Sequence, residues 1–472
     1  MEFPPVSFLR TLALVVSGLA VSGIIAGTGP ASAQSSAKIR TVRDAETEAL
    51  LTDYARPIFK VAGVPSQDVR LVLVDSREFN AFVPDGNHIF MNTGVIVDAL
   101  TPNEVIGVLA HETGHIAGAH QVRMREAMAR AQTLAALTAV LGGAAAVGSA
   151  TRHDSSGVQG GVAAMLGGTT VAQNIFLSYV RTEEMSADQA AIKYLDRTHQ
   201  SGEGMLVTFR RFADRQLVPV RGTDAYASTH PLPRDRIDQL QELVAKSASR
   251  DVKDPPALQA RHDLVRAKLA AFTEPPKTVA ARWPASDTSL PARYARAVIA
   301  HRTAPPADAI RAVDELLHER PDNPYFHELK GQILLESGHP RGALGSLRRA
   351  VQLAPSAGPI RVMLGHAMVA TEDKALLPEA IRILKQAAER DRLDPEPFPH
   401  LGRAFALLGE PAKADLMRAE ELYVSGQIQE ARKFANRARD NLKAGSPEWL
   451  RADDIVSYKP DKDESNSPPR RR

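Results

Sequence analysis

The chain has 472 residues, a length typical of about three domains. Apolar residues make up 44% of it, enough for ordinary globular cores, and a net charge of +3 without one basic face gives no indication of nucleic-acid binding. No cysteine is present, so a thiolate zinc finger, a cysteine protease and a disulfide-bonded fold are excluded.

The first 33 residues have the pattern of a secretory signal peptide. Arg10 supplies a positive charge, residues 12–25 are apolar, and Ala31-Ser32-Ala33 forms a small-residue cleavage site. We expect cleavage after Ala33 and export to the periplasm of a Gram-negative bacterium. An uncleaved membrane anchor is the less favoured alternative, because the apolar segment is short for a full span.

A helix and a small sheet are expected before residue 100. Residues 44–62 place apolar side chains on one side of a helix. Three short segments predict strands, the last two joined by a turn at Asp85-Gly86-Asn87: 69–74, 80–84 and 88–92. Backbone groups at a sheet edge can pair with an extended peptide, so residues 80–83 are a candidate substrate-binding strand. An ordinary hairpin that covers the core is the open alternative.

Residues 101–120 predict a helix with a marked start. Thr101 suits the N-cap, Pro102 suits the first helical position, and Glu104 follows the cap at the spacing of a capping box. Most of the remaining residues are apolar, so we expect the helix to be largely buried.

This helix carries a metal-binding motif. His111 and His115 are four residues apart and therefore share one helix face, from which both imidazoles can bind one ion. Glu112 lies beside them, in the HExxH arrangement of zinc peptidases. The alternative is a buried helix whose histidines donate hydrogen bonds to backbone groups.

Two stretches without charged residues follow, at 133–150 and 155–180, separated by Arg152-His153-Asp154. Glycines interrupt them and strongly apolar residues are sparse, which argues against transmembrane helices. We interpret residues 133–180 as a helical insertion beside the active site, either a lid or an arm in peripheral contact with a membrane. A buried helical hairpin is an equal alternative.

Residues 181–199 predict a further helix that supplies carboxylates. Glu184 and Asp188 are four apart on one face. Glu184 can complete a catalytic zinc site with three protein ligands, and Asp188 can orient a histidine ligand through its second ring nitrogen. Glu183 is the competing candidate ligand. Without the HExxH motif, a salt-bridged surface helix would be the favoured interpretation.

His230 lies in a loop held by Pro231 and Pro233, shortly before Arg236. A lone histidine in a loop is usually a surface residue. Here it can reach the zinc as a fourth ligand or stabilise the oxyanion of a tetrahedral intermediate.

The C-terminal part of the chain has the pattern of helical repeats. Gly331 and Gly365 are 34 residues apart, as are Pro321 and Pro355. Pairs of alanines recur at a spacing of seven: Ala343 and Ala350, Ala380 and Ala387, Ala431 and Ala438. Small residues at fixed offsets are typical of tetratricopeptide repeats, of which we expect about three to four.

Taken together, the patterns predict an α+β fold, with a mostly helical zincin-type peptidase domain and its small sheet followed by an all-α solenoid. The expected organisation is a signal peptide, a peptidase domain, a linker with one helix near 258–272, a repeat domain and a disordered tail: 1–33, 34–250, 251–288, 289–445 and 446–472.

The motifs together resemble a known family. HETGH at 111–115, EMSAD at 184–188, STHP at 228–231 with Arg236, and the segment 80–94 are similar to the zinc metallopeptidases related to the CAAX prenyl endopeptidase and HtpX. The resemblance covers about residues 40–245. It departs from the family in the insertion at 133–180, which is unusually rich in alanine and glycine.

The resemblance implies that His111, His115 and Glu184 bind one Zn2+ per chain and that Glu112 is the catalytic base. It implies that His230 regulates the site by occupying the open zinc position.

By the same resemblance Asp188 supports a ligand from behind, and Arg236 belongs to this supporting group. With a signal peptide before the peptidase domain and repeats after it, the likeness implies a periplasmic quality-control role toward outer-membrane proteins.

We therefore expect a periplasmic zinc-dependent endopeptidase that degrades misfolded or stalled outer-membrane proteins, with repeats that bind the client or the assembly machinery. The first alternative is a chaperone or adaptor whose peptidase site is latent. The second is a scaffold that zinc stabilises without catalysis.

Overall fold

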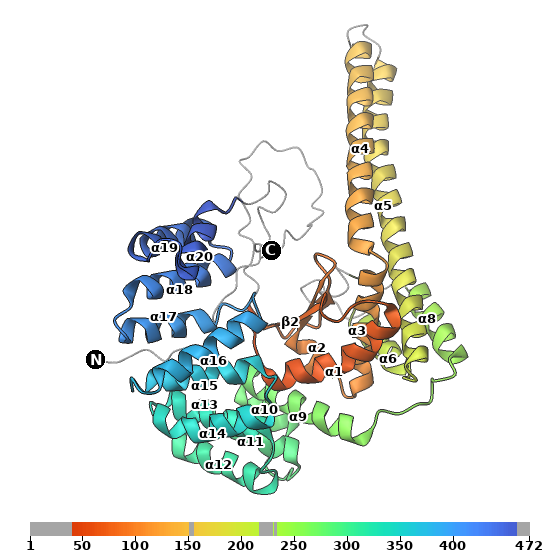
Figure 1. The fold of residues 1–472 in the computed structure, drawn as a ribbon. Coiled ribbons are helices and arrows are strands. Elements are labelled where there is room, and N and C mark those ends of the chain that lie inside the picture. Colours follow the sequence, from red (N-terminus) through yellow and green to blue (C-terminus); the bar gives the residue numbers. More distant parts are fainter. Residues whose placement is uncertain (1–39, 151–154, 217–229, 231–233, 460–472) are drawn as a thin grey trace. The chain divides into compact units, whose positions relative to one another are not determined.

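The computed structural model describes residues 40–150, 155–216, 230 and 234–459 (Figure 1). The expected signal peptide lies outside the described residues. The protein is mostly helical with one small sheet, which confirms the expected α+β class with helical repeats. The described part of the chain divides into two compact units, one made of its residues within 50–72 and 76–263 and the other of its residues within 40–49, 73–75 and 264–459.

The sheet has four strands in the order β1-β2-β4-β3: β1 Thr41–Val42, β2 Arg70–Val74, β3 Ala81–Phe82 and β4 His88–Asn92. Strand β3 lies at one edge and pairs antiparallel with β4, with Ala81 opposite Met91 and Phe82 opposite Phe90. The extended segment expected at 80–84 contributes only two residues to the ladder. Pro84 has no N–H to donate, and Asp85 then accepts the backbone N–H groups of the turn.

Helix α3 Pro102–Ala117 is the central element of the first unit and is buried over almost its whole length. It packs against α5 Ser155–Arg197 and α6 Glu203–Gln216. Two glycines permit this approach: a Cβ on Gly107 would meet Met205 at 2.7 Å, and one on Gly114 would meet the Ala187 carbonyl at 2.9 Å. The sequence therefore brings the carboxylates of α5 close to the histidines of α3.

The start of α3 differs in detail from the expected capping box. Thr101 occupies the N-cap with extended backbone, but its side chain accepts no capping hydrogen bond. Glu104 instead accepts a hydrogen bond from the Leu100 N–H, one residue earlier, and pairs with Arg211 at 2.5 Å. The buried ion pair directs the carboxylate away from the position that a capping box requires.

Helices α4 His120–Ala150 and α5 run side by side as a long hairpin (Figure 1). The helix expected at 181–199 is the last part of α5, which continues through the uncharged segment. Leu137, Val140 and Leu177 are 56%, 69% and 46% exposed. Where side chains are described, the part of the hairpin distant from α3 is therefore exposed, whereas the end of α5 that carries the carboxylates is buried. No helix in the described part of the chain is long and apolar enough to cross a membrane.

Three more helices complete the elements before residue 283: α1 Ala45–Ala62, α2 Thr93–Asp98 and α8 Arg234–Lys246. In the segment expected as a linker, helices α9 Pro256–Thr273 and α10 Pro276–Arg282 form, and the first matches the helix expected at 258–272.

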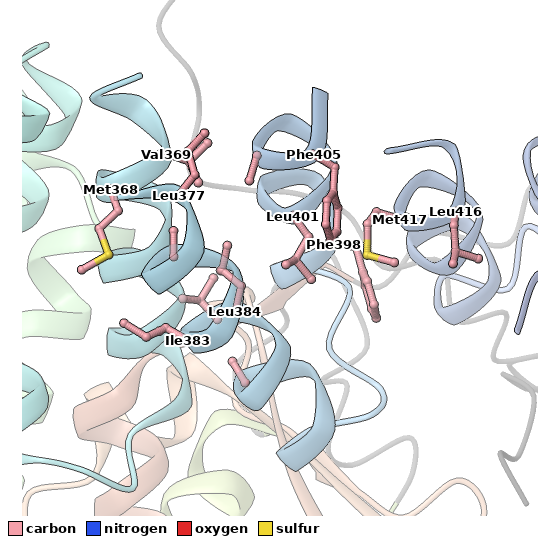
Figure 2. Packing of buried hydrophobic residues seen from close by; sticks show 14 of the residues in the cluster. Met368, Val369, Leu377, Ile383, Leu384, Phe398, Leu401, Phe405, Leu416 and Met417 are labelled. Carbon is pink, nitrogen blue, oxygen red and sulfur yellow. The ribbon is translucent and has the colours of Figure 1, made fainter. Parts of the chain in front are cut away.

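Successive antiparallel helix pairs then build the second unit: α11 Leu290–Thr303, α12 Pro306–Glu319, α13 Pro324–Glu336, α14 Pro340–Leu353, α15 Gly358–Ala370, α16 Leu377–Arg390, α17 Pro397–Leu407, α18 Pro411–Val424, α19 Ile428–Asn441 and α20 Pro447–Ser457. Each helix packs on the next along the chain, around a continuous apolar core that Figure 2 shows between Met368 and Met417. A Cβ on Gly331 or Gly365 would lie about 2.5 Å or less from a leucine of the paired helix, so the glycines spaced by 34 mark the closest helix contacts.

Helix α20 lies in the first part of the segment expected to be a disordered tail, so that expectation was wrong for residues 447–457. The Ser446 side chain accepts from the Trp449 N–H and caps the helix, and Ala452 and Ile455 are buried in the repeat core. Residues 460–472 lie outside the described part of the chain.

Candidate metal centre

Four buried side chains from three parts of the first unit converge on one point. His111 and His115 come from α3, Glu184 from α5, and His230 from the segment before α8. Each offers one ligand atom, and these atoms all lie within 4.8 Å of one another.

The spacing of these atoms suits a tetrahedral ion. The Nε2 atoms of His111 and His115 are 3.0 Å apart, and the Glu184 oxygens lie 3.4 Å from each of them. His230 Nδ1 lies 3.4 Å from His111 Nε2 and 3.0 Å from Glu184. Ligands at about 2.0–2.1 Å from one tetrahedral ion are separated by roughly 3.3 Å, so the residues fit a zinc-like metal.

A carboxylate and a guanidinium support this group from behind. Asp188 Oδ1 lies 2.9 Å from His111 Nδ1, the ring nitrogen that points away from the other ligands. Arg236 donates two hydrogen bonds to Asp188, at 2.5 and 2.9 Å, and its Nη1 lies 2.8 Å from Glu184. These contacts fix the ring of His111 and the carboxylate of Glu184 before any ion binds.

The electrostatics of the group favour a bound cation. Burial holds the pKa of His115 well below its ordinary value, so its ring is neutral and has a lone pair to donate. Burial opposes ionisation of Glu184, but His230, His111 and Arg236 together hold its pKa well below the usual range. Burial likewise opposes the charged form of His111, yet Asp188 and Glu184 raise its pKa to about 9. The carboxylates thus attract positive charge, either a proton or a metal ion.

Glu112 is completely buried, and neither of its carboxylate oxygens has a hydrogen-bond partner among the described residues. Burial raises its pKa. A buried carboxylate without a partner is costly and is typical of a group whose partner is a reactant or a water molecule.

His230 contacts three parts of the centre at once. Its Nδ1 belongs to the ligand group, its Nε2 lies 3.2 Å from the Ala81 carbonyl on β3, and the same nitrogen lies 3.5 Å from Glu112. The Asn92 N–H donates to the Asn80 carbonyl across the ladder, so the next residue, Ala81, directs its backbone groups toward the open side of β3. The imidazole therefore occupies the space between the ligands and the sheet edge.

Comparison with known proteins agrees with this geometry. Residues 43–244 match the model of Peptidase family M48. This segment, a little under half of the chain, is thus similar to an M48 peptidase domain. The resemblance drawn from the motifs is thereby confirmed, and metal dependence and peptidase activity are the properties of this family.

Similarity to curated proteins extends beyond the peptidase segment. The beta-barrel assembly-enhancing protease of Yersinia pestis is 25% identical over 425 residues, which cover 86% of this chain and 82% of the relative. That of Escherichia coli K12 is 23% identical over 390 residues, 81% of this chain and 76% of the relative. A putative one from Vibrio cholerae is 25% identical over 396 residues, covering 81% and 77%.

Within the M48 domain, the structure brings together all the residues singled out from the sequence except Glu183. Glu183 points away from the ligand group, and its carboxylate lies 2.9 Å from His120 Nε2 and accepts from Arg123 at 2.6 Å. The competing assignment of Glu183 as a ligand therefore does not fit the geometry.

The sequence analysis missed His120, which is 2% exposed and lies 2.9 Å from the ligand His115. Five residues after His115, it would point elsewhere if the helix continued. The chain instead leaves α3 after Ala117, and Ala119 has a positive φ of 50° before α4 begins. The signal in the sequence was a third histidine two residues after Gly118, which does not by itself indicate this break.

Proposed function

We propose that the protein is a periplasmic zinc-dependent endopeptidase that degrades misfolded or stalled outer-membrane proteins. The observation that carries the proposal is the buried group of His111, His115, Glu184 and His230 beside the carboxylate of Glu112, which has no hydrogen-bond partner among the described residues. The named activity of the relatives supports the substrate class, and the sequence pattern of residues 1–33 supports export.

We assign His111, His115 and Glu184 as zinc ligands, because two imidazoles and one carboxylate form a common set for catalytic zinc. Zinc held there would act as a Lewis acid toward a water molecule and the scissile carbonyl. Asp188 and Arg236 hold the ligands in place, as the contacts behind His111 and Glu184 indicate.

Glu112 is the proposed general base. Its carboxylate adjoins the ligand group, accepts the proton of the attacking water and passes it to the leaving amine. The open side of β3 lies next to this position, since His230 links the Ala81 carbonyl to the ligand group. An extended substrate added along β3 would therefore present its backbone to Glu112.

Glu112→Gln tests this mechanism. An amide cannot take the proton, so hydrolysis of an unfolded protein such as casein should fall at least about 100-fold while zinc content stays near one ion per chain. The matched control is Glu126→Gln, which changes an exposed glutamate on α4. Proteolysis by E112Q at the natural rate would rule out the proposed base.

The second candidate function is a chaperone or adaptor with a latent peptidase. The position of His230 within the ligand group supports this alternative. A fourth protein ligand leaves no position for water on a tetrahedral ion. Under latency, His230→Ala should increase cleavage of casein and of the chain itself. If His230 instead stabilises the oxyanion, the same substitution should reduce cleavage with zinc retained.

A zinc-stabilised scaffold without catalysis predicts that the E112Q variant keeps its full cellular role. For partners, we propose that the repeats, which fit the tetratricopeptide pattern, bind unfolded clients or the outer-membrane assembly machinery, and that residues 133–180 contact a membrane surface peripherally. No nucleic-acid partner is expected.

A further inference from the structure

We propose that His120 and Glu183 are positioning residues for the ligand His115: together they hold the proton of its imidazole on Nδ1 and so direct the Nε2 lone pair at the metal. The inference rests on the metal centre of the proposed function. It assigns a role to two buried polar groups that do not touch the reacting atoms.

The three side chains form a continuous line away from the ligand group. His115 Nε2 faces the other ligands, and its Nδ1 lies 2.9 Å from His120 Nδ1. The other nitrogen of His120, Nε2, lies 2.9 Å from Glu183 Oε2. Both His120 and Glu183 are buried, so the line is shielded from solvent over this length.

The position of each proton follows from this order. A metal ligand must offer a lone pair, so His115 Nε2 carries no hydrogen and its proton lies on Nδ1. His120 Nδ1 then has to accept, which places the His120 proton on Nε2, 2.9 Å from the Glu183 carboxylate, whose negative charge favours a proton on that nitrogen. The opposite order would put a proton on His115 Nε2 and exclude the ion. Glu183 therefore selects the binding tautomer of His115 through His120.

The backbone is adapted to this contact. A Cβ on Gly118 would lie 2.1 Å from His120 Nε2, so only glycine at the end of α3 lets the His120 ring fold back over the helix. The positive φ of Ala119 then directs the first residue of α4 toward His115. The position of the His120 side chain thus depends on Gly118 and on the positive φ of Ala119. This dependence indicates a specific position for the ring next to His115.

The two histidine ligands are supported in the same way. Asp188 stands behind His111 and is held by Arg236, whereas Glu183 stands behind His115 through His120 and is held by Arg123. Glu183, Glu184 and Asp188 all belong to α5. One helix thus supplies a ligand and the support for both imidazoles.

The experiment measures metal affinity in the full mature chain, apart from proteolysis. Zinc is competed with a chromophoric chelator, and cobalt(II) is used as a spectroscopic probe of the ligand geometry. His120→Phe removes the acceptor while keeping a ring, and we expect 10- to 100-fold weaker zinc binding with a changed cobalt spectrum. His120→Asn retains a side-chain oxygen near the original Nδ1 and should restore most of the affinity.

Two further variants separate positioning from simple packing. Gly118→Ala removes no functional group of His115, His120 or Glu183, but its added Cβ displaces the His120 ring. We therefore expect it to weaken zinc binding about as much as H120F. Glu183→Gln preserves shape and should weaken binding several-fold. Glu126→Gln, on the exposed face of α4, is the matched control and should leave affinity unchanged.

A folded H120F variant that binds zinc within twofold of the natural affinity would overturn the proposal. Circular dichroism of the metal-free chain shows whether H120F folds. If it does not fold, the zinc affinity of E183Q is the deciding measurement. An affinity equal to that of the natural chain would overturn the proposal as well. Because affinity is measured independently of cleavage, an inactive but zinc-binding natural chain would refute the peptidase proposal and leave this one testable.

Discussion

Glu328 is a single buried residue whose charge state should be visible in the stability of the protein. It lies on α13, is 8% exposed, and has its pKa raised from 4.5 to about 8 by burial, with Asp44 and Glu46 adding to the rise and Lys268 opposing it. The carboxyl group is therefore neutral in the folded protein at pH 7, whereas in the unfolded chain it is ionised.

Glu328→Gln should remove a pH-dependent loss of stability. The folded state binds one more proton than the unfolded state between pH 4.5 and 8, so the natural chain loses up to about 1.4 kcal/mol per pH unit as pH rises through this window. An amide mimics the protonated form, so the variant should match the natural chain near pH 4.5 and exceed it at pH 8.

Urea unfolding at several pH values measures this difference. Glu315→Gln, an exposed glutamate on α12, is the control and should leave the pH profile unchanged. A constant difference between E328Q and the natural chain at all pH values would contradict the raised pKa.

At the scale of elements, strand β3 is the proposed link between the candidate metal centre and an extended substrate. The carbonyl of Ala81 faces the open edge and is in contact with His230. The neighbouring residue Asn80 accepts the ladder hydrogen bond from β4.

Ala81→Pro should therefore impair substrate binding more than folding. Proline removes the outward N–H of an edge strand but no donor to β4. Because Ala81 is fully buried, the side chains around it must also accommodate the proline ring. We expect a higher KM for an unfolded protein substrate, with kcat and metal content nearly unchanged. Thermal unfolding serves as the control for folding, and an unaltered KM in a folded variant would argue against substrate pairing along β3.

The hairpin of α4 and α5 presents apolar side chains to solvent. Leu137 and Val140 are each more than half exposed, in a segment without charged residues. Burial of such a side chain in an apolar environment contributes about 1.5–3 kcal/mol, which favours a peripheral lipid contact.

Leu137→Asp combined with Val140→Asp should reduce co-sedimentation with phospholipid vesicles at least about tenfold, since both apolar side chains are replaced by charges that lipid disfavours. Casein hydrolysis should not change. The matched control is Val252→Asp, an exposed valine outside the hairpin. If instead casein hydrolysis rises and vesicle binding persists, the hairpin is a lid.

Local patterns predicted the elements of the site well. The start of α3, the strand at 88–92 and the pairing of His111 with His115 follow from caps, alternation and helical spacing, which act over a few residues. The helix expected to continue to His120 ends at Ala117 instead. Contacts that depend on distant segments were not predictable. The fold of His120 onto His115 depends on a backbone break, and the capping role of Glu104 was overridden by Arg211, 107 residues away.

At the scale of the whole molecule, the boundary between the two compact units passes through α1. Asp44 and Glu46 belong to the unit that contains the repeats, where Lys268 Nζ lies 2.6 and 3.1 Å from their carboxylates. Arg43 pairs there with Asp394 at 2.7 Å. These pairs join residues more than 200 positions apart, so no reading of local sequence could have found them.

A fragment of residues 34–250, the expected peptidase domain, should therefore be much less stable than the full chain. It leaves Asp44 without Lys268, Arg43 without Asp394 and Glu46 without Lys268 and Tyr294, so the start of α1 loses the partners that hold it. Thermal unfolding followed by circular dichroism compares fragment and full chain. Asp44→Asn and Glu46→Gln in the fragment should recover part of the loss. A fragment that unfolds at the temperature of the full chain would show that these pairs are dispensable.

Helix α5 runs without interruption for 43 residues, about 65 Å, from the far end of the hairpin to the residues beside the metal. Glu183, Glu184 and Asp188 lie within two helical turns of one another near its buried end. A change in the position of that end would move both imidazole supports and the carboxylate ligand together.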